Sequence, residues 1–78
     1  MPTVLRVGPH RFHFFSDEGT EPPHIHVRTA EREAKYWLEP VELVWARGYN
    51  SRELNQLRRI VEDNFELFLS KWYEHPSN

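Results

Sequence analysis

The segment HIHVR, residues 24–28, decides the fold class because its side chains alternate between polar and apolar. Successive side chains of a β-strand point to opposite faces of a sheet, so a period of two predicts a strand. Ile25 and Val27 then face a core, and His24, His26 and Arg28 share the opposite, outward face. Two prolines precede the segment, and Pro-Pro favours an extended chain. We therefore expect the chain to enter this strand extended and stiff.

Three further runs predict strands around this segment. Residues 3–7 and 11–15 flank a Gly-Pro turn and are expected to form a hairpin. Residues 33–38 alternate again between apolar and polar side chains. The four strands are expected to form an antiparallel sheet with one apolar face, made of Phe12, Phe14, Ile25, Val27, Ala34, Tyr36 and Leu38.

The apolar period changes after residue 38, which predicts helices. Pro40 suits a first helical turn, residues 41–45 include an i, i+3, i+4 spacing, and Gly48 suits a helix end, so a short helix is expected there. Asn50 and Glu53 have the spacing of a capping box and open a longer helix. Its apolar stripe is expected to pack on the sheet and consists of Leu54, Leu57, Val61, Phe65, Phe68 and Trp72. His75-Pro76 is expected to end this helix.

The expected fold is therefore α+β: a four-stranded antiparallel sheet (ββββαα) with one short and one long helix packed on one face. With 78 residues, the chain is expected to form a single domain over residues 1–78. The absence of cysteine excludes disulfides and thiolate metal sites. No long apolar run suggests a signal peptide or a membrane span, so we expect a cytoplasmic protein without membrane contact.

The outward face of the expected sheet carries the candidate site. Basic and aromatic side chains alternate there, a combination that holds phosphate and stacks bases. The expected catalytic residues are His24, His26 and Lys35. The expected substrate-binding residues are Arg11, His13, Arg28 and Trp37.

The His24-x-His26 pair has three interpretations. The histidines are polar residues of an exposed strand, hydrogen-bonded to Glu21 or Asp17. Alternatively, they act as general acid and base on a phosphodiester, with Arg28 and Lys35 stabilising the developing charge. The third interpretation is a metal site, which needs another ligand. The candidates for that ligand are Glu21, His13 and Glu18, none at a diagnostic spacing, so we expect no tightly held metal and no cofactor.

Five segments of the sequence resemble domain-of-unknown-function family 4160, a family of small, mostly prokaryotic proteins. They are MPTVLRVG, RFHFFSDEG, EPPHIHV, AKYWLEPV and the late ELxxLxxIVE, with EPPHIHV the most specific. Members are often encoded beside a small protein of family 2442, an arrangement similar to a toxin–antitoxin pair. The resemblance implies a toxin-like role with a cognate partner. The residues that match the family pattern are Glu21, Pro22, Pro23, His24, His26, Lys35, Trp37 and Leu38.

Three functions therefore compete at this point. The first is a toxin-like effector that acts on RNA as a ribonuclease. The second is a non-catalytic module that binds protein or nucleic acid through the same face, and the third is a small metalloprotein. Apolar residues off the main helical stripe, namely Ile60, Leu67 and Tyr73, together with Leu43, indicate an interface. We accordingly expect a homodimer or a complex with a small cognate antitoxin-like protein.

Overall fold

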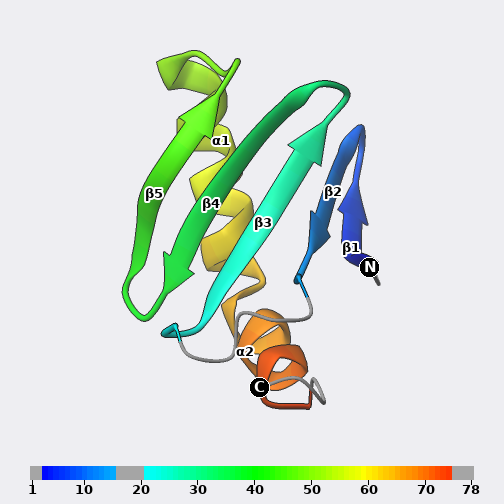
Figure 1. Cartoon of the computed structure of the whole chain (residues 1–78), viewed down its shortest axis with the longest axis vertical. Coiled ribbons are helices and arrows are strands. Elements are labelled where there is room, and N and C mark those ends of the chain that lie inside the picture. Colours follow the sequence, from blue (N-terminus) through cyan, green and yellow to red (C-terminus); the bar gives the residue numbers. More distant parts are fainter. Residues whose placement is uncertain (1–2, 16–20, 75–78) are drawn as a thin grey trace.

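The computed structural model describes residues 3–15 and 21–74, which form a five-stranded antiparallel sheet and two helices (Figure 1). The strands are β1 (Thr3–Val7), β2 (His10–His13), β3 (His24–Thr29), β4 (Arg32–Leu38) and β5 (Val41–Arg47). The helices are α1 (Ser51–Asp63) and α2 (Phe65–Glu74). Each strand pairs with the next along the chain, in the order β1-β2-β3-β4-β5. No helix within the described ranges has the length and apolar character needed to cross a membrane.

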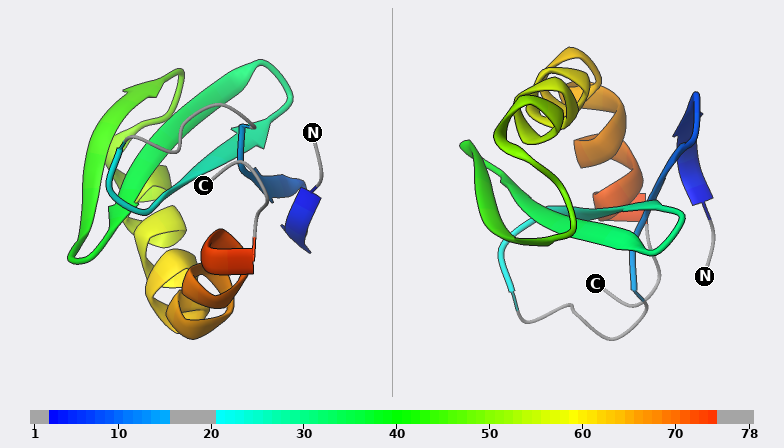
Figure 2. Two further views of the ribbon diagram at one scale, coloured as in Figure 1. Left: turned by 60° about the horizontal axis from the view of Figure 1, so that its bottom comes forward. Right: turned by 90° about the horizontal axis from the view of Figure 1, so that it is seen from above.

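Both helices lie on the same side of the sheet, so the molecule has two layers and one sheet face without a helix (Figure 2). We call this second side the open face. Between the layers lies the core, and every apolar sheet residue expected there is buried: Phe12, Phe14, Ile25, Val27, Ala34, Tyr36 and Leu38. From the helices, Leu57, Val61, Phe68 and Trp72 are buried against them. The alternation of strand side chains therefore predicted the core face correctly.

The expected short helix is wrong, because residues 41–47 form the fifth strand. The run VELVWAR fits either structure over so short a length, and its β-branched and aromatic residues suit a strand paired to a neighbour. Pro40 lies in the two-residue turn between β4 and β5 rather than in a helix. Gly48 follows β5 with a φ of 91°, a left-handed conformation that glycine adopts without strain.

The expected long helix is two helices, because it is interrupted at Asn64. The Asn64 side-chain amide donates to the carbonyl of Ile60 at 2.8 Å, closing the end of α1. At the start of α1 the expected capping box is present: the Asn50 side chain accepts from the Glu53 backbone at 2.8 Å, and Glu53 accepts from the Asn50 backbone at 2.9 Å. The apolar stripe continues across the interruption, so both helices cover the same sheet face.

A polar network fastens the start of α1 to one end of the sheet. Arg32 of β4 pairs with Glu53 of α1, and its guanidinium lies 5.3 Å from the centre of the Tyr49 ring. The Tyr49 hydroxyl donates to Thr29 Oγ1 at 2.9 Å, and Thr29 Oγ1 lies 2.7 Å from Nδ1 of His10. This network ties the start of α1 to β4 and to the end of β3.

Both edge strands of the sheet are irregular. The pairing of β1 with β2 shifts between Thr3 and Leu5, and the pairing of β4 with β5 shifts where Val44 is the extra residue. A bulge of this kind bends an edge strand and discourages another chain from pairing with it. The edges are therefore poor places for strand addition, which leaves the two broad faces as contact surfaces.

Candidate functional site

The strand register arranges the open-face side chains in rows across the sheet. Side chains of directly paired residues lie on the same face, so a chain of such pairs across neighbouring strands forms a row. One row, here called the arginine row, consists of Arg6, Arg11, Arg28, Glu33 and Arg47. The next, the histidine row, consists of Thr3, His13, His26, Lys35 and Trp45. The open face thus places one row of cations directly beside a row rich in rings.

The arginine row holds four arginines and one glutamate. Glu33 is partly buried and accepts a hydrogen bond from the exposed Arg47 at 3.3 Å. Arg28 is opposite Arg11 on one side and Glu33 on the other, and its Nε donates to the Ala30 carbonyl at 3.2 Å. Among the described residues, neither Arg11 nor Arg28 forms an ion pair with a carboxylate. Two like charges placed directly opposite destabilise a sheet, so this pair suits an anion that is supplied from outside.

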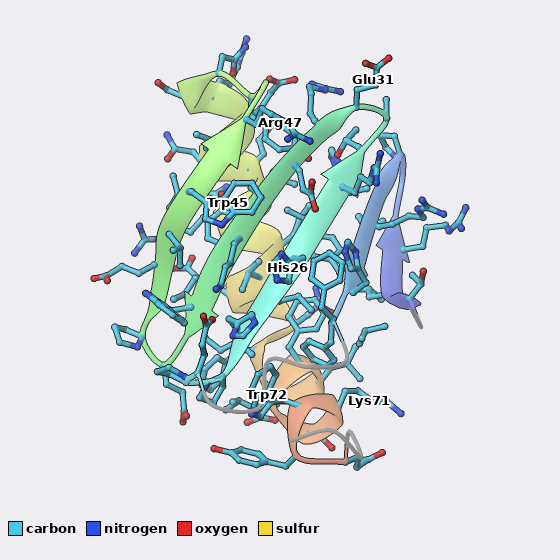
Figure 3. All side chains as sticks on the ribbon, viewed as in Figure 1. His26, Glu31, Trp45, Arg47, Lys71 and Trp72 are labelled. Atoms are coloured by element: carbon cyan, nitrogen blue, oxygen red, sulfur yellow. The ribbon has the colours of Figure 1, made fainter. Side chains whose placement is uncertain are left out.

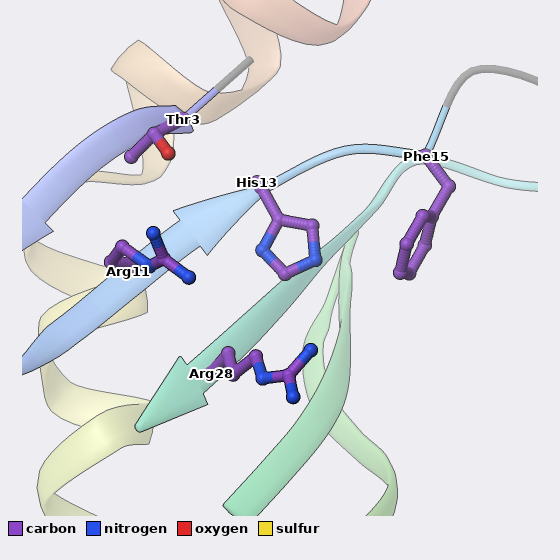
Figure 4. Close-up of a pocket in the computed structure, with 5 residues that line it drawn as sticks. All are labelled: Thr3, Arg11, His13, Phe15 and Arg28. Atoms are coloured by element: carbon purple, nitrogen blue, oxygen red, sulfur yellow. The ribbon is translucent and has the colours of Figure 1, made fainter. Parts of the chain in front are cut away.

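A small pocket lies between these two arginines and the histidine row (Figure 4). Its volume is about 170 Å³, and its lining residues are Thr3, Arg11, His13, Phe15 and Arg28. Figure 4 shows the His13 ring and both guanidinium groups turned toward the same space, with the Phe15 ring at its side. The Phe15 ring meets the His13 ring edge-on, with 4.9 Å between ring centres.

The His13 imidazole is held in its neutral form. Burial lowers its pKa from 6.5, and the neighbouring charges of Arg11 and Arg28 lower it further. Glu33 and a backbone hydrogen bond involving Arg11 act in the opposite direction, but burial is the largest cause. Neutral imidazole offers one donor and one acceptor nitrogen, so His13 can act as a proton acceptor at neutral pH.

His24 and His26 lie on the open face, as expected, but they are buried rather than exposed, with 0% and 3% of their surfaces accessible. The His24 ring packs 4.8 Å from the centre of Trp72 and 5.8 Å from that of Trp37. Its Nδ1 lies 2.8 Å from the Pro22 carbonyl, which only accepts, so Nδ1 carries the proton. The expectation that both histidines face solvent is therefore wrong, because aromatic rings gather around them.

His26 lies in the middle of this ring cluster (Figure 3). Its ring stacks on His13 with 5.7 Å between ring centres and meets Phe15 edge-on at 4.4 Å. The Trp45 ring is 6.3 Å away on the other side. His26 is therefore one layer below the accessible surface that His13, Phe15 and Trp45 form.

Lys35 is also withdrawn from solvent, with 7% of its surface accessible. Its Nζ donates to Glu21 Oε1 at 2.5 Å and lies 5.0 Å from the centre of the Trp37 ring. The same Glu21 oxygen lies 3.7 Å from His24 Nδ1. Glu21 thus neutralises Lys35 and borders His24. The Pro-Pro step holds this carboxylate at the entry to β3, since Leu38 donates from its backbone to the Pro23 carbonyl at 3.0 Å.

The structure divides the seven expected site residues into two groups. Arg11, His13 and Arg28 meet at the pocket, whereas His24, His26, Lys35 and Trp37 form the ring-lined part of the face. Sequence reasoning missed Arg6, Trp45 and Arg47. Arg6 alternates with Leu5 and Val7, a signal that was visible. Trp45, 41% exposed, and Arg47 become visible only once residues 41–47 are known to be a strand with a bulge.

Metal ligands do not cluster in the described part of the chain. No group of three or more His, Asp or Glu side chains within residues 3–15 and 21–74 is arranged to hold an ion. Two residues named from sequence, Asp17 as a hydrogen-bond partner and Glu18 as a third ligand, lie outside the described residues.

Comparison with known proteins identifies the family. A family model described as Domain of unknown function (DUF4160) matches residues 10–73. The chain belongs to this family. No curated protein and no solved structure matches the chain. The DUF4160 match spans β2 to α2 and so contains nearly the whole open face.

Proposed function

We propose that this protein binds single-stranded RNA on its open face and acts as the toxin-like component of a two-protein pair. The arginine row is the observation that carries the RNA-binding part. Four arginines and a single glutamate form one row across a face of a chain whose formal net charge is −2, and Glu42, opposite Trp37, lies two rows away on the same face. Such a separation of charge makes one face attractive to a polyanion although the whole molecule is not basic.

The neighbouring rings favour a single strand over a duplex. Trp45 is in the histidine row, directly beside the arginine row, and the Phe15 ring packs on His26 of the same row. Trp37 lies in the row that follows the histidine row, opposite His24. Unpaired bases stack on such rings, each contributing about 1–3 kcal/mol, while the sugar–phosphate backbone follows the cations. A flat sheet with rings and cations on one face suits RNA whose bases are splayed out.

Binding without cleavage is the activity that the geometry favours. Cleavage through His24, His26 and Lys35 stays a prediction. It requires a phosphodiester to reach three buried side chains, of which Lys35 is also paired with Glu21. Contact with RNA falls instead to accessible residues such as Arg6, Arg28 and Trp45. The toxin-like role would then arise from sequestering RNA, with the cognate partner relieving it.

Fluorescence anisotropy with a labelled single-stranded RNA of about 12 nucleotides tests RNA binding. In the variant Arg6→Gln/Arg47→Gln we expect binding about tenfold weaker, and a salt dependence reduced by about 1.4 in the slope of log K against log salt. The matched control is Arg52→Gln/Arg59→Gln, which removes two exposed arginines from α1 on the other side of the molecule. Equal losses in both variants would show that RNA responds to net charge alone and would overturn the proposal.

A further inference from the structure

We propose that the pocket between Arg11 and Arg28 binds a terminal phosphate monoester of an RNA chain. This inference rests on the RNA binding proposed above and names the group for which the open face is specific. The pocket residues are Thr3, Arg11, His13, Phe15 and Arg28. Their charge, the size of the space that they enclose and the position of one ring support a chain end.

Charge matches a monoester better than a diester. Arg11 and Arg28 are directly opposite each other on β2 and β3, and within the described residues neither has an ion-pair partner. The nearest carboxylate in the row, Glu33, pairs with Arg47. Two guanidinium forks complement a group with a charge of about −1.5 to −2, which a phosphate monoester has at neutral pH. An internal phosphodiester has a single negative charge, so it would neutralise only one of the two guanidinium groups.

His13 is expected to gain a proton when an anion binds, and the resulting imidazolium can donate a hydrogen bond to that anion. Burial and the two arginines hold the pKa of His13 below 6.5, opposed by Glu33 and a backbone hydrogen bond. Among the described residues, the titratable His26 ring also stacks on His13. An anion beside His13 cancels the effect of the arginines and favours the imidazolium. Binding is therefore expected to take up a proton, while the Thr3 hydroxyl offers a neutral donor at the same rim.

Size and ring position indicate a chain end. A volume of about 170 Å³ accepts a phosphate group with some water but lies below the roughly 300–1,000 Å³ typical of sites that enclose a whole small molecule. The Phe15 ring borders the pocket on the side toward His26. A terminal nucleotide can thus place its phosphate in the pocket and its base near Phe15, while the rest of the strand continues along the face.

The test compares RNAs of one sequence that differ only at their ends. Three oligonucleotides are used: one with a 5′-phosphate, one with a 3′-phosphate and one with hydroxyls at both ends. We expect one of the two phosphorylated RNAs to bind about tenfold more tightly than the hydroxyl-ended RNA. Arg28→Gln should remove this advantage, whereas Arg6→Gln, which leaves the pair of Glu33 with Arg47 intact, should weaken all three RNAs by the same factor. The phosphorylated RNA that binds more tightly identifies which end of the RNA the pocket binds.

The outcomes separate this inference from the proposed function. If all three RNAs bind equally and Arg6→Gln still weakens them, the face binds RNA and the terminal-phosphate inference is wrong. If no RNA binds, both the RNA assignment and this inference are wrong.

A second measurement follows the His13 ring by NMR during titration with methyl phosphate and with dimethyl phosphate. We expect methyl phosphate to raise the His13 pKa and dimethyl phosphate to raise it much less. His10 is the internal control, because it lies on the opposite sheet face, beside Thr29. Equal responses to the two phosphates, or an equal response of His10, would contradict the inference.

Discussion

At the scale of the residue, Arg11 and Arg28 are like charges placed directly opposite each other, and no ion pair among the described residues joins either of them to a carboxylate. Glu33 is opposite Arg28 on the other side but pairs with Arg47. Both Arg11 and Arg28 are exposed, and the Arg28 guanidinium donates to a backbone carbonyl. Favourable cross-strand pairs contribute about 0.2–1 kcal/mol each, and like charges placed directly opposite each other destabilise a sheet. A local arrangement that destabilises the fold is a common sign of a functional site.

We therefore expect Arg11→Gln to raise the free energy of unfolding by about 0.2–1 kcal/mol while it weakens RNA binding. Urea unfolding of the purified variant measures the first effect, and Arg52→Gln on α1 is the control for loss of one exposed arginine. A clear decrease in stability for Arg11→Gln would show instead that this arginine stabilises the sheet.

Two histidines make stability depend on pH. Burial lowers the pKa of both His10 and His13 in the folded protein, so the unfolded chain binds more protons around and below pH 6.5. For His10, Arg32 also lowers the pKa and Glu53 raises it, with Thr29 in hydrogen-bond contact. The stability is thus fully present above the unfolded pKa and is lost as pH falls through the folded pKa.

The expected result is a free energy of unfolding that decreases from about pH 7 to pH 5, and decreases less steeply in His10→Gln. Denaturant titrations at several pH values measure both slopes. The lowered pKa of Glu53 acts in a separate, more acidic range, below its ordinary value of 4.5. A wild-type stability that rises on acidification across the histidine range would refute the assignment.

Residue alternation was enough to predict which sheet side chains face the core. It was not enough to predict the exposure of His24 and His26, because exposure depends on which rings lie beside them. Trp72 reaches His24 from α2, and Trp45 reaches the His26 side from β5. Both neighbours require the strand register and the helix position, which a single sequence does not contain.

At the scale of the element, β5 and the connection that follows it determine where α1 begins relative to the sheet. Residues 41–47 satisfy a helical spacing and a strand composition at once, and only pairing with β4 settles the matter. The bulge at Val44 also breaks the period of two, which hid the strand. The capping box at Asn50 and Glu53, in contrast, is a local signal, and it was predicted and confirmed.

Gly48, in the connection between β5 and α1, has no room for a side chain. Its φ is 91°, and a Cβ there would lie 2.5 Å from Cγ of Arg32, the residue that pairs with Glu53 of α1. We expect Gly48→Ala to lower the free energy of unfolding by about 1–3 kcal/mol. Gly8→Ala is the matched control, since Gly8 has a φ of 57° with no atom within 4 Å of the added Cβ. Chemical denaturation compares the two, and equal losses would mean that contact with Arg32 has no effect.

At the scale of the whole molecule, the two faces suit different partners. The open face has cations and rings, whereas the helical side exposes apolar residues that the core does not use. Leu67 and Tyr73 of α2 are exposed, Tyr73 by 69%, and Leu43 of β5 is exposed beside α1. Ile60, expected to be exposed as well, instead packs partly against the core. With both sheet edges bulged, we propose that a second copy or a cognate small protein docks on the helices.

Light scattering of the protein, alone and co-expressed with the product of the neighbouring gene, tests this docking. We expect a homodimer or a stable complex, and we expect Leu67→Ser/Tyr73→Ser to shift it to monomers without loss of RNA binding. The matched control is Lys71→Ser, which shortens an exposed polar side chain on the same helix and should leave the assembly intact. A strictly monomeric protein that does not bind the product of the neighbouring gene would exclude the proposal.

RNA is expected to contact the open face and to leave the helical face untouched. NMR of ¹⁵N-labelled protein, titrated with the hydroxyl-ended single-stranded RNA, measures this directly because arginine side chains and tryptophan indoles give separate signals. We expect the signals of Arg6, Arg11, Arg28 and the Trp45 indole to shift together, while the arginines of α1, namely Arg52, Arg58 and Arg59, remain unchanged. Shifts centred on α1, with the open-face arginines unmoved, would contradict RNA binding by the open face.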